Sequence, residues 1–183
     1  MRSCIEDAIR ARKNSCEIAT EKEVSNALDR MASEASEFLC TKNPVVLAVM
    51  RGGAFTAVEL CCRFDFPHEF DFIHVSRYDK NLKGGNLSWF VLPKENLQGR
   101  VVLVVDDILD EGKTLQEIHE KLYQYGVSMI LSAVLVKKKL KSIDHKNVNF
   151  VGVEIEDVYV FGCGLDYKGY WRGLKSLHSL GEY

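Results

Sequence analysis

The stretch that most constrains the fold is residues 100–115, RVVLVVDDILDEGKTL, in which an apolar run leads directly into two adjacent acids. The run Val101 to Val105 is β-branched and does not alternate with polar residues, which is typical of a strand buried on both faces of a parallel sheet. Apolar side chains then recur at helical spacing from Leu115 to Tyr125, and Gly126 suits the end of a helix. The segment is therefore predicted to be a strand, an acidic loop and a helix.

An acidic loop in this position lies at the carboxyl end of a strand, where open α/β sheets bind their ligands. It also ends at a helix N-terminus, where backbone N–H groups bind anions, and Gly112 would let a ligand approach closely. Lys113 and Thr114 add a positive charge and a hydroxyl. Asp106 and Asp107 would repel a phosphate, but they suit a ligand that offers ribose hydroxyls or carries a divalent cation.

Other parts of the chain repeat the pattern of strand and helix. Thr20 and Glu23 form a capping box, which predicts a long amphipathic helix over about residues 21–40 with Phe38 among its apolar positions. The run Val45 to Met50 is a second strand of the buried, parallel type. Further strands are predicted at Phe70 to Val75, Leu87 to Leu92, Ile130 to Val136 and Val148 to Ile155. This interleaving predicts an α/β domain with a mostly parallel sheet.

Arg51, Gly52 and Gly53 follow the second strand and precede a helix predicted over about residues 54–63. The arginine and the glycine amides could hold a diphosphate, since the loop would supply N–H groups at close range. Taken alone, the same three residues favour a plain tight turn over a binding loop.

Length and charge exclude several classes of protein. The chain has 183 residues and a net charge of −2, which fits one domain and gives no reason to expect nucleic-acid binding. It has no apolar run long enough for a membrane span, and the charged N-terminal segment does not resemble a secretory signal. The six cysteines lack CxxC spacing, so free thiols in a reducing cytoplasm are expected rather than a zinc site.

The segment from Val101 to Thr114, VVLVVDDILDEGKT, resembles the phosphoribosyl-diphosphate signature of the type I phosphoribosyltransferases, and specifically that of the hypoxanthine-guanine branch. A Walker A loop is the main competitor, but Asp107 occupies the place of its upstream glycine. An acidic solvated turn before an amphipathic helix is the other alternative. The resemblance extends over most of residues 20–175, with four motifs in the family's order.

The resemblance implies a fold and a reaction. The fold is a mostly parallel twisted sheet flanked by helices, with a core of about residues 20–155 and a small hood from about residues 1–19 and 156–183, in a single domain spanning 1–183. The reaction is transfer of 5-phosphoribosyl from phosphoribosyl diphosphate to N9 of hypoxanthine or guanine, with Mg²⁺, giving IMP or GMP and diphosphate. A homodimer or homotetramer is also implied.

Each part of the substrate has implied partners. Asp110 would be the catalytic residue, acting at the purine as a general base or as a stabilising charge. The ribose and 5′-phosphate would bind Asp106, Asp107, Asp110, Glu111, Gly112, Lys113, Thr114 and Leu115. The diphosphate would bind Arg51, Gly52 and Arg172. The purine would bind Lys137, Tyr159, Val160 and Asp166. The metal ligands would be Asp166, Asp106 and Asp107. Ser76 and Tyr78 would belong to a closing lid.

Lys137 is the base-reading residue in this scheme, as the first residue after its predicted strand. A lysine donor selects a six-oxopurine over adenine, because an amine opposite it would leave donors unpaired. Lys138, Lys139 and Lys141 are expected to form an ordinary solvated face. Without the resemblance, Tyr159 would be expected to be a core aromatic. The last ten residues have the character of a tail.

Two residues depart from the family's pattern. Glu111 stands where threonine or serine is usual in the phosphate loop, so phosphoribosyl diphosphate binds more weakly or the carboxylate faces a cation such as Lys113. Arg51 replaces a lysine, which keeps the charge but changes its geometry.

Two other activities stay open. One is a transferase that prefers xanthine, and the other is a regulator that binds the nucleotide without catalysis. A regulator of transcription would need a basic face, and the lysines at 137–141 are too few to supply one.

Overall fold

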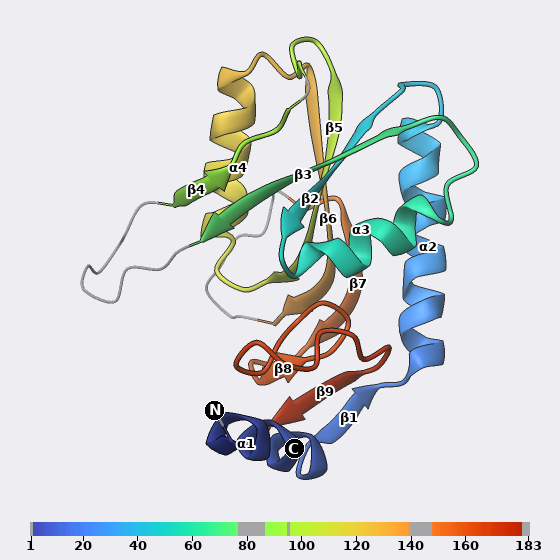
Figure 1. Cartoon of the computed structure of the whole chain (residues 1–183). Coiled ribbons are helices and arrows are strands. Elements are labelled where there is room, and N and C mark those ends of the chain that lie inside the picture. Colours follow the sequence, from blue (N-terminus) through green and yellow to red (C-terminus); the bar gives the residue numbers. More distant parts are fainter. Residues whose placement is uncertain (1, 77–86, 95, 140–147, 181–183) are drawn as a thin grey trace.

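The computed structural model describes residues 2–76, 87–94, 96–139 and 148–180, with side chains from residue 4 onward. Tyr78 and Lys141 lie outside the described residues. Nine strands within these ranges form two sheets, a larger one of six strands and a smaller one of three (Figure 1). The predicted mostly parallel sheet is the larger of the two.

The larger sheet has the strand order β4-β3-β2-β5-β6-β7, and its neighbouring strands are parallel except for β3 and β4. Its strands are β2 (Val45–Met50), β3 (Glu69–Ser76), β4 (Ser88–Val91), β5 (Val101–Leu109), β6 (Met129–Lys138) and β7 (Phe150–Ile155). The central strands β2 and β5 lie side by side, so the loops that follow them meet at one edge of the sheet.

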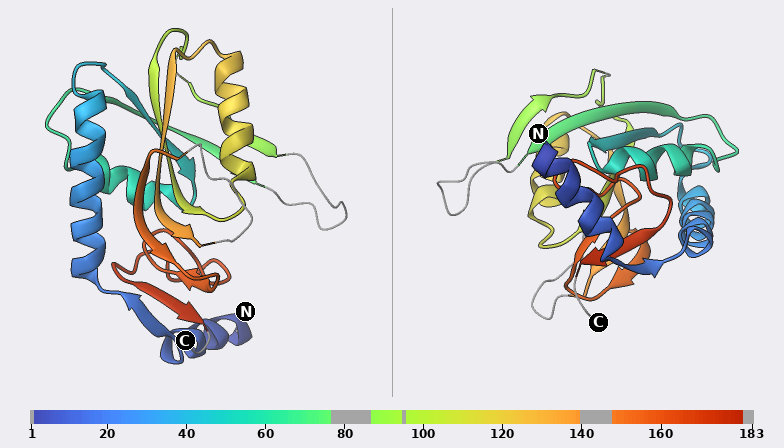
Figure 2. Two further views of the ribbon diagram at one scale, coloured as in Figure 1. Left: turned by 180° about the vertical axis from the view of Figure 1, so that it is seen from behind. Right: turned by 60° about the horizontal axis from the view of Figure 1, so that its bottom comes forward.

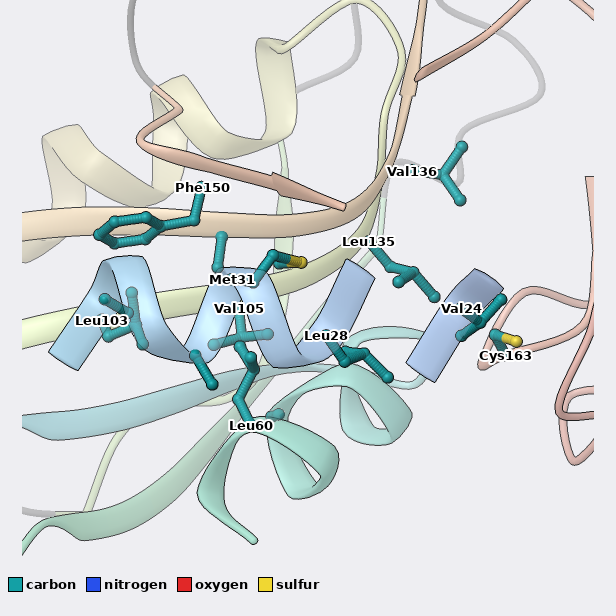
Figure 3. Packing of buried hydrophobic residues seen from close by; sticks show 14 of the residues in the cluster. Val24, Leu28, Met31, Leu60, Leu103, Val105, Leu135, Val136, Phe150 and Cys163 are labelled. Atoms are coloured by element: carbon teal, nitrogen blue, oxygen red, sulfur yellow. The ribbon is translucent and has the colours of Figure 1, made fainter. Parts of the chain in front are cut away.

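Helices cover both faces of this sheet. They are α2 (Glu21–Leu39), α3 (Gly53–Cys61) and α4 (Lys113–Gln124). Helices α2 and α3 pack on one face, and α4 packs on the other (Figures 1 and 2). Figure 3 shows Leu28 and Met31 of α2 and Leu60 of α3 close to Leu103 and Val105 of β5. Apolar side chains on both faces of β5 are thereby removed from water, as its unalternating sequence predicted.

The long helix α2 begins where its capping box predicts. Oγ1 of Thr20 accepts a hydrogen bond from the backbone N–H of Glu23 at 3.3 Å, and the Glu23 carboxylate accepts one from the Thr20 N–H at 2.8 Å. The prediction that Phe38 lies on the buried face is wrong, because its side chain is 56% exposed. Leu39, which the same helical spacing also predicted as apolar, is fully buried, whereas Phe38 only meets Phe150, with ring centroids 6.1 Å apart.

The smaller sheet lies at the end of α2, and with helix α1 it forms the hood (Figure 1). Its elements are α1 (Arg2–Lys13), β1 (Cys16–Ala19), β8 (Tyr159–Phe161) and β9 (Leu177–Leu180). The strand order is β1-β9-β8, and both pairs are antiparallel. The hood thus joins the two ends of the chain, as the family resemblance implied.

Helix α1 is hydrogen-bonded to the segment that precedes β9. Asp7 accepts hydrogen bonds from Nζ of Lys168 at 2.6 Å and from the hydroxyl of Tyr167 at 3.1 Å. Nε1 of Trp171 donates to the carbonyl of Ala8 at 2.8 Å. These contacts hold the N-terminal helix against residues 167–171.

Three predictions about element boundaries are wrong. The last ten residues are not simply a tail, because Leu177, His178 and Ser179 are at most 1% exposed in the central strand of the hood. Strand β5 continues to Leu109, so Asp106 and Asp107 lie within a strand and not in a loop. Strand β6 likewise continues to Lys138 and includes Lys137. Periodicity could not show this, because pairing between the two strands extends them past their apolar cores.

None of the helices in the described part of the chain is long and apolar enough to cross a membrane. All six cysteines are free thiols, as expected.

Candidate functional site

Three segments that are distant in sequence lie in close contact at the carboxyl edge of the larger sheet. They are the Arg51 loop, the end of β5 and the C-terminal segment. A Cβ atom on Gly52 would lie 1.6 Å from Oδ2 of Asp107, so any other residue here would displace this carboxylate. A Cβ atom on Gly164 would lie 2.1 Å from the Gly52 carbonyl oxygen. The Arg51 loop therefore lies between the end of β5 and the C-terminal segment.

A cavity of about 260 Å³ opens where these segments meet. It brings together predicted site residues from four separate motifs. Those residues are Arg51, Gly52, Ser76, Asp106, Asp107, Thr114, Asp166 and Arg172. Local sequence motifs predicted each of these residues separately, and the fold gathers them around one space.

A second cavity of about 310 Å³ is lined by the consecutive residues 106–115. Helix α4 begins there after Gly112, whose φ of 75° is left-handed, and no side chain caps the helix. Backbone N–H groups and the positive end of the helix dipole therefore face the cavity, as an anion site requires. Leu115 is only 2% exposed and packs in the core, so only its backbone is available to a ligand.

Glu111 lies in this loop and pairs with a cation, as one of the two sequence alternatives proposed. Its carboxylate lies 2.5 Å from Nζ of Lys113, and both side chains are more than half exposed. The pair turns the Glu111 charge toward Lys113, although both residues still line the cavity.

Of the two acids near the end of β5, Asp106 is buried and Asp107 is half-buried. Asp106 is 8% exposed, and its Oδ1 accepts a hydrogen bond from the backbone N–H of Asp107 at 2.9 Å. Burial, and then the nearby charge of Asp107, raise the pKa of Asp106 well above its ordinary value. Burial also raises the pKa of Asp107, although the Arg172 charge opposes this shift. Two neighbouring carboxylates, one buried and one half-buried, suit ligands that donate hydrogen bonds or carry positive charge.

Asp166 is held by the C-terminal segment itself. Its Oδ1 lies 2.5 Å from Nη2 of Arg172, and its Oδ2 accepts a hydrogen bond from the Gly169 N–H at 2.6 Å. Nη1 of Arg172 donates to the Gly164 carbonyl at 2.6 Å. Among the described residues, no three His, Cys, Asp or Glu side chains are grouped closely enough to hold a metal. The predicted metal ligands Asp106, Asp107 and Asp166 therefore do not converge into a ligand cluster.

Tyr159 differs from the core aromatic that its sequence alone would suggest. Its side chain is 50% exposed, whereas the next residue, Val160, is 6% exposed. The Tyr159 hydroxyl donates to the backbone carbonyl of Asp166 at 2.9 Å. One ring face is therefore available beside a segment that lines the first cavity.

The three described lysines at the end of β6 have different surroundings. Nζ of Lys137 lies 2.8 Å from Glu154, and the Lys137 side chain is 26% exposed. Lys139 is 51% exposed and pairs with Glu156 at 3.0 Å, which confirms the expected solvated position. That expectation is wrong for Lys138, which is only 15% exposed and pairs with acids on both sides.

The acids around Lys138 are Asp110, at 3.7 Å from Nζ, and Asp157, at 2.8 Å. Sequence reasoning missed Lys138 and Asp157, and no local signal identifies them, because their contacts depend on how β5, β6 and β7 pair. It also missed Gly164, which has a left-handed φ of 98° and lies close to Gly52. The two glycines at 162 and 164 are the sequence signal that could have identified it.

Comparison with known proteins gives matches along most of the chain. Residues 15–168 match the family model described as the phosphoribosyl transferase domain. A hypoxanthine-guanine-xanthine phosphoribosyltransferase from Tritrichomonas foetus is 30% identical over 161 residues, which cover 87% of this chain and 88% of that protein. The human hypoxanthine-guanine phosphoribosyltransferase is 29% identical over 172 residues, covering 87% of this chain and 78% of the human one.

Solved structures give the same result for the fold. The crystal structure of a hypoxanthine phosphoribosyltransferase from Staphylococcus aureus superimposes with a TM-score of 0.86 at 25% identity, and it covers 93% of this chain and 94% of its own. The predicted fold class, a mostly parallel sheet flanked by helices with a hood from both ends of the chain, is confirmed.

Proposed function

Because the chain belongs to the phosphoribosyl transferase domain family, we propose that it is a purine salvage enzyme that transfers 5-phosphoribosyl from phosphoribosyl diphosphate to N9 of hypoxanthine or guanine. The products are IMP or GMP and diphosphate. The observation that carries this proposal is the cavity lined by Arg51, Ser76, Thr114 and Arg172, where four motifs meet. The names of the relatives support the same reaction.

The loop before α4 would bind the 5′-phosphate. Its N–H groups, from Asp110 to Leu115, face the second cavity together with the Thr114 hydroxyl and the Lys113 charge. Asp106 and Asp107 would accept hydrogen bonds from the ribose hydroxyls. Hydrogen bonds from these hydroxyls would offset the loss of solvation that raises the pKa of both carboxyls.

The opposite side of the first cavity would bind the diphosphate. Arg51, the Gly52 amide and Arg172 supply positive charge and N–H groups there. We further propose Mg²⁺ as the cofactor, near Asp106, Asp107 and Asp166. Asp106, Asp107 and Asp166 line the same cavity, and Mg²⁺ usually keeps waters and takes further oxygens from phosphate substrates. Bound there, Mg²⁺ would neutralise the diphosphate that departs.

The purine would lie between the hood and the end of β5. Tyr159 would stack on the base through its exposed ring, the Val160 backbone would read the ring edge, and Lys137 would donate to the six-oxo group. Asp110, on the turn after β5, would take the purine proton as a general base or stabilise the charge that develops. Ser76, at the end of β3, would belong to a lid that excludes water during transfer.

Xanthine is the second candidate base, because the Tritrichomonas foetus relative is named for all three six-oxopurines. We also propose, on the family resemblance, a homodimer or homotetramer that works in the cytoplasm.

A spectrophotometric assay tests the proposal. The protein is mixed with phosphoribosyl diphosphate, Mg²⁺ and hypoxanthine, guanine, xanthine or adenine in turn. Turnover of hypoxanthine and guanine, with none of adenine, is expected. Binding of phosphoribosyl diphosphate without consumption of any base would contradict the enzyme and favour a regulator.

A further inference from the structure

We propose that Lys138 is a positioning residue, which holds the carboxylate of Asp110 in place for catalysis and ties it to the segment that leads into β8. The inference rests on the proposed function, in which Asp110 acts on the purine. It assigns a role to a lysine that the sequence analysis treated as part of a solvated face.

The burial of Lys138 is the first argument. Its side chain is 15% exposed, whereas that of the next residue, Lys139, is 51% exposed. A lysine side chain so far removed from water needs opposite charges close to its ammonium group. Asp110 and Asp157 supply two such charges, at 3.7 Å and 2.8 Å from Nζ.

The location of these acids is the second argument. Lys138 ends β6, and β6 lies between β5 and β7 in the sheet. Asp110 follows β5, and Asp157 follows β7, two residues before Tyr159. One ammonium group therefore connects the ends of three adjacent strands at the edge where the substrate would bind.

The mobility expected of Asp110 is the third argument. Its side chain is 53% exposed on a turn, so few packing contacts restrict its rotamer. A catalytic group must be held near its productive geometry, and a displacement of about 1 Å can cost roughly 100-fold in rate. The ion pair with Lys138 supplies a restraint that the turn alone lacks.

Lys137 contrasts with Lys138. Lys137 pairs with Glu154 on the neighbouring strand, at 2.8 Å, and it is proposed to read the six-oxo group. A substitution of Lys137 should therefore change the choice of base. A substitution of Lys138 should slow hypoxanthine and guanine alike, because Asp110 would serve both bases.

Steady-state kinetics on wild type, Lys138→Met, Lys138→Arg and Lys139→Met test the proposal. We expect Lys138→Met to lower kcat about tenfold with both bases, while the KM for phosphoribosyl diphosphate changes less than about twofold. Lys138→Arg should recover most of the rate, because it restores the charge. Lys139→Met is the matched control, since it removes an exposed lysine one residue away, and its rate should equal that of wild type.

A double-mutant cycle with Asp110→Asn separates positioning from a general structural role. If Lys138 acts through Asp110, Lys138→Met should slow the Asp110→Asn enzyme by less than about twofold, since the partner is already lost. An equal tenfold loss in both backgrounds would overturn the proposal. So would an unchanged kcat in Lys138→Met.

Two further outcomes have a defined meaning. Should Lys138→Met not fold, Asp157→Asn removes the other anchor at a side chain that is 62% exposed, and a fall in kcat with both bases is expected. An unchanged Asp157→Asn would then overturn the proposal. A wild type that consumes no purine would overturn the proposed function and this inference with it, whereas an active wild type with unaffected variants would overturn the inference alone.

Discussion

Strand β5, taken together with Asp110 directly after it, has two halves, one of which serves the stability of this molecule and the other its chemistry. Val101 to Val105 are at most 9% exposed and pack on both faces of the sheet. The following residues, Asp106 to Asp110, include three carboxylates, two of which burial drives to a raised pKa. The first half stabilises the fold because it is apolar. The second half is expected to lower stability, because burial disfavours the charged form of Asp106 and Asp107.

The largest effect on the second half is expected from Asp110→Asn. The substitution keeps the shape but removes the charge and the proton acceptor, so kcat should fall by about 100- to 1,000-fold, in the range usual for general acid–base groups. The midpoint of urea unfolding should stay close to that of wild type, because the side chain is 53% exposed. A variant with full kcat would show that Asp110 is not the catalytic residue.

Leu103→Ala is the matching change in the first half. The side chain is fully buried, so the free energy of unfolding should drop by about 2–5 kcal/mol, as large-to-alanine changes in cores do. Urea denaturation followed by circular dichroism measures the drop. The fraction that remains folded should retain the wild-type KM for hypoxanthine, and a KM changed more than about tenfold would contradict the division between the halves.

Glu111→Thr should act in the opposite direction from Asp110→Asn. It removes an anion from the proposed phosphate loop and frees Lys113 from its ion pair. The KM for phosphoribosyl diphosphate should fall about three- to tenfold, which corresponds to roughly 1 kcal/mol for one charge near the surface. Glu120→Thr, an exposed acid further along α4, is the control and should leave that KM unchanged. A raised KM in Glu111→Thr would show that the acid helps binding.

The smallest effect concerns His119, which lies on α4 away from the acidic half of β5. Burial lowers the pKa of His119, and its Nε2 lies 2.6 Å from Oγ of the buried Ser132. The folded state therefore favours the neutral ring, and the unfolded chain binds more protons as the pH falls through about 6.5. Stability should fall with that change, and less steeply in His119→Gln. Unfolding free energies at pH 7.5 and 5.5 measure it, and equal losses in both proteins would contradict the assignment.

Much of the larger sheet could be predicted because its signals are local. The apolar runs of β2, β5 and β6 and the capping box of α2 each lie within one short window of sequence. The extensions of β5 and β6 could not be predicted in this way, since pairs such as Leu109 with Lys137 depend on the sheet.

The hood was even harder to predict from local sequence signals. Its strand β9 pairs with β1, so that Glu17 lies opposite His178, and no local pattern connects residues so far apart. The sequence of this short strand therefore predicts only a tail.

The candidate site likewise combines residues that local motifs predict with residues whose contacts depend on the fold. The four motifs identified Arg51, Ser76, Thr114 and Arg172, and the fold brings them to one cavity. The surroundings of Lys138 could not be predicted, because a row of lysines gives no indication of which one faces inward. That choice depends on the acids that neighbouring strands place around it.

The measurement that tests the division within β5 most directly is the melting temperature of wild type and Asp106→Asn, with and without phosphoribosyl diphosphate and Mg²⁺. Without ligand, the variant should melt higher, because it removes a carboxylate whose charged form burial disfavours; a gain of about 2–4 °C corresponds to roughly 1 kcal/mol in a chain of this size. With ligand, wild type should gain more and the order should reverse. A variant that melts lower without ligand, or gains as much as wild type with it, would contradict the account.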